Sequence, residues 1–183
     1  MASTPQAEIK VGKSENRLVQ FKEFSVRDDR CAMKIGTDAL LLASWCSVDS
    51  MLEIVDLGCG SGIIALMIAQ RASQARVLGV ELEENAAKQA SSNMAVSPFS
   101  NRMEAILQSA QQFASQSDNK KKFDLVVCNP PYFHGKPKSP DPARNLARHD
   151  ESLTLKELLM TAQEIMKLNG RLALAWPMDR KEQ

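Results

Sequence analysis

An alternating glycine run at residues 56–62, DLGCGSG, is the feature that most constrains what this chain can fold into. The apolar residues 54–57 predict a short buried strand before the turn, and residues 63–72 predict an amphipathic helix after it. Glycines at such a turn let the backbone adopt positive φ and pass close to a ligand, and the helix N-terminus offers free N–H groups to an anion. The run therefore predicts a strand–turn–helix unit that binds a nucleotide.

Strand and helix patterns alternate along the rest of the chain and predict an α/β fold. Further strands are expected at 76–80, 103–107, 124–128 and 172–176, and helices at 39–45, 63–72, 83–94 and 155–168. This order predicts a doubly wound, mostly parallel sheet with helices on both faces. Because a bare fifth strand would leave an unpaired edge, we expect the chain to lack the last strands of its sheet.

Capping residues mark the ends of two of these helices. Thr37 or Asp38 can cap the helix at 39–45, and Thr154 with Glu157 forms a capping box for the helix at 155–168. Gly170 is expected to close that last helix as its C′ residue. Residues 1–20 show no periodicity and are expected to form a flexible N-terminal arm, which leaves one domain at residues 21–183.

Composition argues against several classes of protein. The formal net charge of +1 gives no overall attraction to nucleic acid or membrane, so any steering must come from local patches. The four cysteines form no C-x-x-C pair and have no histidine at metal-ligand spacing, which predicts reduced thiols and no metal site. Neither a signal peptide nor a run long enough to span a bilayer is visible. We expect a cytoplasmic monomer without a membrane or metal partner.

The glycine spacing indicates which ligand the turn binds. A dinucleotide fingerprint, G-x-G-x-x-G, would need a glycine where Ile63 stands, which disfavours an NAD-dependent oxidoreductase. The run D-x-G-x-G-x-G instead resembles motif I of Rossmann-like class I methyltransferases, which implies S-adenosylmethionine as the cofactor. The cofactor-binding residues that this resemblance assigns are Asp56, Gly58, Gly60 and Gly62.

The nucleoside part of the cofactor would be held after the next two strands. Glu81 closes the strand at 76–80, where a carboxylate can accept hydrogen bonds from both ribose hydroxyls. NAD carries the same ribose, so Glu81 alone does not discriminate between the two ligands. Methyltransferases often have an acidic residue near the end of the third strand. This chain has Gln108-Ser109-Ala110 there, and Ser109 is the candidate contact to the cofactor.

The tetrapeptide Asn129-Pro130-Pro131-Tyr132 follows the strand at 124–128. Ligands of an open parallel sheet bind beyond the carboxyl ends of its strands, at the switch point, so we expect this motif beside the glycine run. The Asn129 oxygen and the Pro130 carbonyl can accept hydrogen bonds from a planar nitrogen whose lone pair is otherwise delocalised. Pro131 stiffens the loop, and Tyr132 offers a face on which a flipped base can stack. The motif predicts direct methyl transfer to an adenine amine or to an amide nitrogen.

Residues upstream of the glycine run narrow the acceptor through a family resemblance. The segment 24–38, FSVRDDRCAMKIGTD, resembles the signature of the bacterial tRNA1(Val) (adenine-37-N6)-methyltransferase family, and residues 97–99 and 147–149 are similar to further family segments. The resemblance covers about residues 20–178 and implies N6-methylation of adenine 37 in a valine tRNA. It also implies that the upstream segment helps to close over the cofactor, a role assigned to Lys34, Gly36, Thr37 and Asp38.

Basic residues near the tetrapeptide favour RNA as the substrate, because they can contact phosphates. Those assigned to substrate binding are Lys136, Arg144 and Arg148. Two alternatives stay open. A protein glutamine-N5 methyltransferase would use the same tetrapeptide, but that family usually carries an N-terminal helical domain, and only about fifty residues precede the first strand here. The other is an S-adenosylmethionine-binding module without catalysis. Trp45 and Trp176 are expected in the core.

Overall fold

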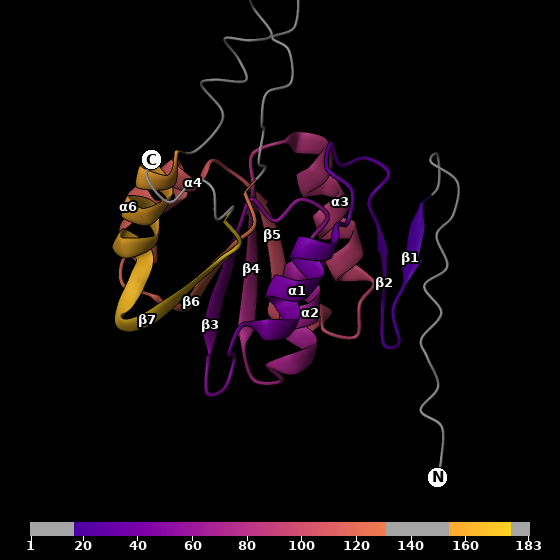
Figure 1. Cartoon of the computed structure of the whole chain (residues 1–183), viewed down its shortest axis with the longest axis horizontal. Coiled ribbons are helices and arrows are strands. Elements are labelled where there is room, and N and C mark those ends of the chain that lie inside the picture. Colours follow the sequence, from indigo (N-terminus) through magenta and orange to yellow (C-terminus); the bar gives the residue numbers. More distant parts are fainter. Residues whose placement is uncertain (1–16, 131–153, 177–183) are drawn as a thin grey trace, which may run out of the picture.

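Seven strands and five α-helices lie within residues 17–130 and 154–176, the part of the chain that the computed structural model describes (Figure 1). The strands are β1 (Leu18–Gln20), β2 (Ser25–Arg27), β3 (Glu53–Leu57), β4 (Arg76–Glu81), β5 (Met103–Leu107), β6 (Phe123–Cys128) and β7 (Met166–Leu174). The helices are α1 (Thr37–Trp45), α2 (Ile63–Arg71), α3 (Glu84–Ala95), α4 (Ala110–Ser115) and α6 (Leu155–Ile165), with 3-10 turns η2 (Ser100–Arg102) and η3 (Ser117–Asn119).

The larger sheet is parallel throughout and has the order β5-β4-β3-β6-β7. The chain runs outward from β3 to β5 and then returns to β6 on the other side of β3, so the winding reverses between these two strands. In register, Leu57 at the end of β3 lies opposite Cys128 at the end of β6. The predicted α/β, doubly wound, Rossmann-like fold is confirmed. Residues after Trp176 lie outside the described part, so the expected lack of further strands stays a prediction.

Helices cover both faces of this sheet (Figure 1). On one face α1, α2 and α3 enclose a core that includes Ile54 and Leu125, and on the other α4 and α6 enclose a core that includes Val55 and Val126. Successive strand residues point to opposite faces, so Ile54 and Val55 enter different cores although they are neighbours in β3. Burial on both faces explains why β3 and β6 are nearly continuous apolar runs.

A short antiparallel hairpin of β1 and β2 precedes the parallel sheet. Val19 pairs with Val26, both are buried, and Phe24 stacks on Phe21 with ring centroids 4.8 Å apart. Residues 18–20 are therefore a strand, and their assignment to a flexible arm was wrong. The arm was inferred from a lack of periodicity, which a strand of three residues is too short to display. Residues 1–16 lie outside the described part of the chain.

The predicted N-cap is confirmed at one helix and is wrong at another. Thr154 and Glu157 form the predicted capping box at the start of α6: the Thr154 hydroxyl accepts from the Glu157 N–H, and the Glu157 carboxylate accepts from the Thr154 N–H. The N-cap of α1 is Gly36, without a side-chain hydrogen bond. The predicted cap at Thr37 or Asp38 was wrong, because both residues already lie inside the helix.

Gly170 marks an irregularity of β7 and not the end of a helix. α6 ends at Ile165, earlier than predicted, and β7 begins at the following residue. A Cβ at position 170 would stand 3.0 Å from the carbonyl oxygens of Lys167 and Phe123. The register between β6 and β7 shifts between Phe123 and Leu125. The glycine thus permits a close backbone approach at a bulge, which sequence alone does not distinguish from a helix C-terminus.

The indole of Trp45 is 90% exposed at the end of α1, so its predicted place in the core was wrong. Ala39 and Ala43 lie four residues apart and are buried, whereas Leu41 and Trp45 lie on the opposite side of the same helix and are exposed. Trp176 is half-buried. Within the described ranges the structure contains no helix long and apolar enough to cross a membrane.

Candidate active site

The glycine run follows β3 and turns the chain into α2. Gly58, Gly60 and Gly62 have φ values of 72°, 55° and 80°, which glycine adopts without strain. The N–H groups of Gly58 and Cys59 donate to the Val80 carbonyl at 2.8 and 3.1 Å, which fastens the run to β4. A Cβ at Gly58 or Gly60 would meet nothing within 4 Å. The run therefore presents bare backbone to open space, beside the positive N-terminal end of α2.

The Glu81 carboxylate at the end of β4 is aimed at the glycine run. One oxygen accepts from the Gly60 N–H at 2.8 Å, and the other accepts from the Leu82 and Glu83 N–H groups at 2.9 Å each. An ionised carboxylate has about four acceptor positions, so these three bonds fix its orientation and leave room for another donor. Glu81 thus keeps acceptor capacity for a ligand hydroxyl, and its contact with the ribose stays a prediction.

Ser109 lies close to Glu81 at the same edge of the sheet. The Gln108 N–H donates to the Glu81 carbonyl at 2.9 Å, and Ser109 follows as the N-cap of α4. The Ser109 hydroxyl accepts from the Gln112 N–H at 3.1 Å, so its own proton is still available to a ligand. α4 has only six residues, too few to show a clear period, so the sequence does not predict this helix.

Asp56 lies beneath the run and not in the open space above it. Its side chain is fully buried, and neither carboxylate oxygen has a hydrogen bond of ordinary geometry among the described residues. Burial raises the pKa of Asp56 from 3.8 to about 7; the Ala65 N–H lowers it and the Glu81 charge raises it further. A carboxyl group with this pKa changes its charge near neutral pH.

Asn129 directly follows β6 and lies at the switch point beside Gly58, because Cys128 and Leu57 are in register. Its side-chain oxygen is buried and has no hydrogen-bond partner among the described residues. Pro130 is half-buried next to it. An unsatisfied buried acceptor is costly, and it is expected where a ligand supplies the missing donor. The remaining predicted residues lie outside the described part: Pro131, Tyr132, Lys136, Arg144 and Arg148.

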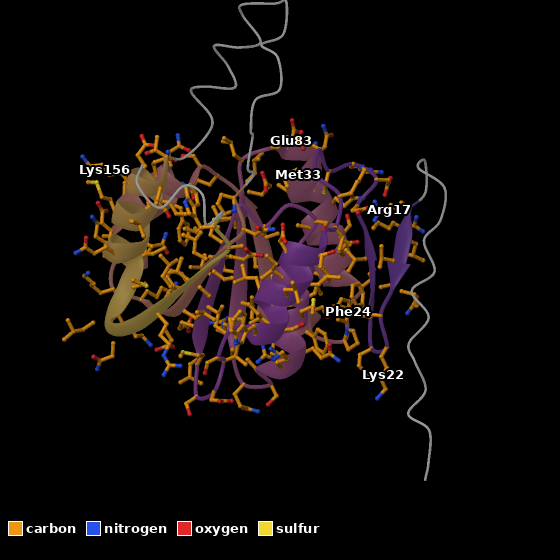
Figure 2. All side chains as sticks on the ribbon, in the orientation of Figure 1. Arg17, Lys22, Phe24, Met33, Glu83 and Lys156 are labelled. Carbon is orange, nitrogen blue, oxygen red and sulfur yellow. The ribbon has the colours of Figure 1, made fainter. Side chains whose placement is uncertain are left out.

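The upstream segment approaches the site at the end of β4. Figure 2 shows Met33 of this segment and Glu83 at the same end of the molecule. Asn93 of α3 donates hydrogen bonds to the carbonyl oxygens of Arg27 in this segment and of Ser61 in the glycine run, which places the segment close to the run. Burial, with Asp28 and Glu81, raises the pKa of Cys31 to about 12. The sequence-based expectation that residues 24–38 lie over the cofactor is compatible with this position.

Lys34 organises the upstream segment from within. Its ammonium donates to the carbonyl oxygens of Asp28, Asp29 and Cys31 at 2.8, 3.1 and 2.9 Å, which uses all three of its protons. The buried Asp28 carboxylate accepts from the Ile35 N–H at 2.8 Å and closes the same loop. Lys34 therefore shapes the loop in this structure. The other predicted residues, Gly36, Thr37 and Asp38, are exposed like Lys34 and lie at the start of α1.

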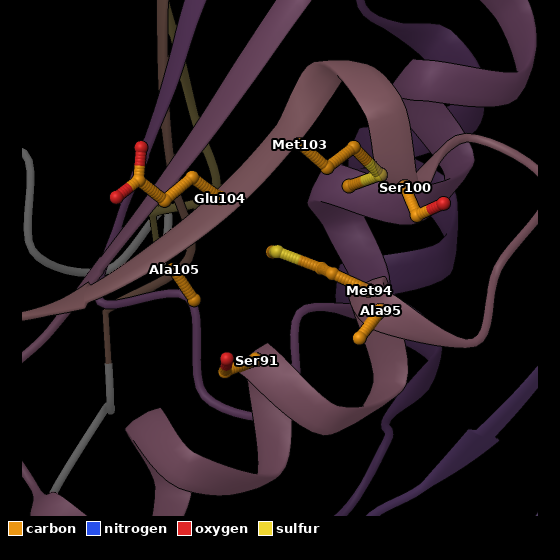
Figure 3. A pocket seen from close by; sticks show the side chains of 7 residues that line it. All are labelled: Ser91, Met94, Ala95, Ser100, Met103, Glu104 and Ala105. Atoms are coloured by element: carbon orange, nitrogen blue, oxygen red, sulfur yellow. The ribbon is translucent and has the colours of Figure 1, made fainter.

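A separate pocket of about 280 Å³ lies between α3 and β5, and Figure 3 shows Met94 projecting into it. It touches the first residues of β5, Met103 to Ala105, whereas Glu81 pairs with Leu107 at the far end of that strand. The pocket is therefore not the glycine-run site. Within the described ranges no cluster of three histidine, cysteine, aspartate or glutamate side chains could hold a metal ion.

Two buried polar residues near the site are not among the predicted site residues, namely Gln89 and Asn93 of α3. Both form hydrogen bonds with residues of the upstream segment that lie 58 to 66 positions earlier in the sequence. The available signal was their spacing, because Gln89 and Asn93 lie on the same side of α3 as buried Ala86, Ala90 and Met94. A polar residue on the apolar side of a helix requires a buried partner.

Solved structures of low sequence identity share this fold. The SAM-dependent methyltransferase from Agrobacterium tumefaciens matches with a TM-score of 0.63 at 17% identity, over 90% of this chain and 53% of that one. The structure of Pyrococcus horikoshii TYW2 in complex with MeSAdo matches with a TM-score of 0.59 at 16% identity, over 85% and 50%. At these identities the matches show the Rossmann-like fold. The family model for the methyltransferase small domain matches residues 31–179. Together with the glycine run and the oriented carboxylate of Glu81, this match defines a Rossmann-like, S-adenosylmethionine-dependent methyltransferase.

Sequence relatives define the family within that class. The tRNA1(Val) (adenine(37)-N6)-methyltransferase of Bacteroides fragilis is 43% identical over 163 residues, which cover 89% of this chain and 68% of that protein. Its namesake from Yersinia enterocolitica is 45% identical, over 89% and 64% of the two chains. The chain belongs to the tRNA1(Val) (adenine(37)-N6)-methyltransferase family, which confirms the predicted resemblance.

Proposed function

We propose that this chain transfers the methyl group of S-adenosylmethionine to N6 of adenine 37 in a valine tRNA. The observation that carries the proposal is the Asn129 side-chain oxygen, which is buried at the switch point beside the glycine run and accepts no hydrogen bond from any residue that the structure describes. Relatives at 42–45% identity that bear the name of this activity support the choice of acceptor.

The glycine-run site fits the cofactor. Space is open at Gly58 and Gly60, where a side chain would fill it. Glu81 and Ser109 stand at the ends of neighbouring strands and would hold the ribose and adenine. The free N–H groups at the N-terminus of α2 would hold the carboxylate of the methionine part. When bound, S-adenosylmethionine supplies an electrophilic methyl group on a sulfonium centre. No general base is needed at first, because the proton can leave the nitrogen after transfer.

Asn129 would orient the nucleophile. The exocyclic amine of adenine is weakly nucleophilic because its lone pair is delocalised into the ring. An acceptor aimed at each of its N–H bonds favours the charge that develops on the nitrogen during attack. We assign these acceptors to the Asn129 side-chain oxygen and the Pro130 carbonyl. A buried acceptor that is already in place has no water to shed at the moment of reaction.

The remaining roles extend the proposal to the RNA. We assign Tyr132 to stacking on the flipped adenine, Pro131 to stiffening the loop, and Lys136, Arg144 and Arg148 to phosphate contacts. We also propose that the protein acts as a monomer in the cytoplasm. The free state of all four cysteines, each of them buried, is compatible with a reducing compartment.

Labelled methyl transfer tests the proposal. The chain is incubated with methyl-labelled S-adenosylmethionine and an unmodified valine tRNA transcript over a range of salt concentrations. We expect label in the RNA, and at least about a hundredfold slower incorporation by an Asn129→Ala variant that still binds S-adenosylhomocysteine. Absence of label in the RNA at every salt concentration would contradict the proposal. Label in a release factor would indicate glutamine methylation instead.

A further inference from the structure

Asn93 of α3 joins the upstream segment directly to the glycine run. It is 4% exposed, and its amide nitrogen donates to the carbonyl oxygens of Arg27 at 2.7 Å and Ser61 at 2.9 Å. Its amide oxygen accepts from the Arg27 N–H at 3.0 Å. The Asn93 side chain thus binds the N–H and the carbonyl of Arg27 in β2 and also the Ser61 carbonyl of the glycine run. Both donor protons of its amide are in use.

Gln89, one turn earlier on α3, holds the same segment further along. Its amide oxygen accepts from the Arg30 N–H at 2.8 Å and from the Cys31 thiol at 3.4 Å, and its amide nitrogen donates to the Asp29 carboxylate at 2.9 Å. Gln89 is as buried as Asn93 and uses both ends of its amide. The upstream segment therefore hydrogen-bonds to two successive turns of α3.

α3 also lies directly under the glycine run. Met94 follows Asn93, and its terminal methyl stands 3.1 Å from the position that a Cβ would take at Gly62 or at Gly79. The run therefore contacts α3 in two ways, by the hydrogen bond from Asn93 to Ser61 and by packing on Met94. Motion of the run relative to the upstream segment has to break these contacts or move the helix.

We propose that Asn93 is a positioning residue for the methyl donor, supported by Gln89. The bonds of Asn93 hold the upstream segment and the glycine run in one fixed arrangement before the donor arrives, which reduces the ordering that binding requires. The inference rests on the proposed function in one respect, namely that the ligand of the run is S-adenosylmethionine. Because Asn93 is buried beneath the backbone that it holds, its effect is on donor affinity and not on the transfer step.

Binding of S-adenosylhomocysteine by calorimetry tests the inference without any acceptor. We expect Asn93→Ala to weaken binding about tenfold, the size of a net loss of one or two hydrogen bonds. At saturating S-adenosylmethionine its kcat stays within about twofold of the unaltered chain while its KM for the donor rises. In the ligand-free protein, backbone amides of residues 58–62 exchange faster with solvent in this variant.

Asn119→Ala is the matched control. Asn119 is 6% exposed and donates at 2.9 Å to the Phe113 carbonyl and to the Gln116 side chain, beside the core on the opposite face of the sheet from α3. This variant should lose similar thermal stability and bind S-adenosylhomocysteine within about twofold of the unaltered chain. Equal weakening in both variants, or none in Asn93→Ala, would overturn the inference.

If Asn93→Ala does not fold, Gln89→Ala is the variant to measure. It removes the hydrogen bonds of Gln89 to residues 29–31 and leaves the hydrogen bonds of Asn93 to Arg27 and Ser61 intact. We then expect a smaller but measurable loss of donor affinity at unchanged kcat, and unchanged affinity would overturn the inference. Failure of the unaltered chain to bind S-adenosylhomocysteine would count against the proposed function. The exchange of residues 58–62 would still decide whether α3 holds the run.

Discussion

Replacement of Asp56 by asparagine isolates the effect of a buried carboxyl group on stability. Because the pKa of Asp56 rises from 3.8 to about 7 on folding, the folded protein retains a proton between these pH values that the unfolded chain releases. This proton makes its full contribution to the free energy of unfolding below about pH 4. The contribution is lost as the pH rises through about 7. Complete ionisation of Asp56 lowers the free energy of unfolding by about 4 kcal/mol, of which roughly 2–3 kcal/mol is lost between pH 5 and pH 8. Asparagine has nearly the same shape and does not ionise.

The assay is urea unfolding at pH 5, 6, 7 and 8, followed by circular dichroism. The stability of Asp56→Asn relative to the unaltered chain should increase by roughly 2–3 kcal/mol from pH 5 to pH 8. Asp124→Asn is the control. Burial raises the Asp124 pKa, but hydrogen bonds from Lys167 and the backbone outweigh it and lower the pKa, so this carboxylate stays ionised throughout the range. A constant difference between Asp56→Asn and the unaltered chain across this range would refute the reasoning.

Three further predictions concern the glycine run and its neighbours. Gly62→Ala should destabilise the protein by about 1–3 kcal/mol more than Gly58→Ala in urea unfolding, because both have positive φ but only the added methyl at 62 meets another side chain. Glu81→Gln should weaken S-adenosylhomocysteine binding about tenfold in calorimetry, because an amide has one acceptor oxygen where the carboxylate accepts from Gly60 and two further N–H groups. Asn129→Ala should leave that affinity within about twofold while methyl transfer falls, which equilibrium binding and single-turnover rates separate.

The parts of the fold that the sequence predicts correctly are those with local signals. The glycine run, the apolar strands that flank it and the capping box of α6 each lie within a few residues. The position of Asn129 beside Gly58 also follows from sequence, because the winding rule of parallel sheets places the ends of the first and fourth strands together. The structure has the corresponding pairing of Leu57 with Cys128.

The parts that sequence does not predict depend on partners far along the chain. The bonds of Asn93 to Arg27 span 66 residues, and nothing in the local sequence of α3 specifies what its buried amides bind. Trp45 is exposed because α1 turns its alanines toward the core that it shares with α2, although apolarity alone favours burial of the indole. Gly170 follows a helix at a spacing that suits a C-cap. Its actual role is to permit close backbone approach where the register between β6 and β7 shifts, and this depends on the pairing of distant strands. Lys34 was assigned to the cofactor through the family, and its bonds to three carbonyl oxygens show a local role that residue identity does not reveal.

Mass spectrometry of the nucleosides in a treated tRNA tests the central claim most directly. An unmodified valine tRNA transcript is incubated with this chain and S-adenosylmethionine, digested, and mapped for methylated bases. The account predicts a single N6-methyladenosine at position 37, which is absent when guanosine replaces that adenosine and when Asn129→Ala replaces the unaltered chain. Methylation of any other base, or no methylation by a chain that binds S-adenosylhomocysteine, would contradict it.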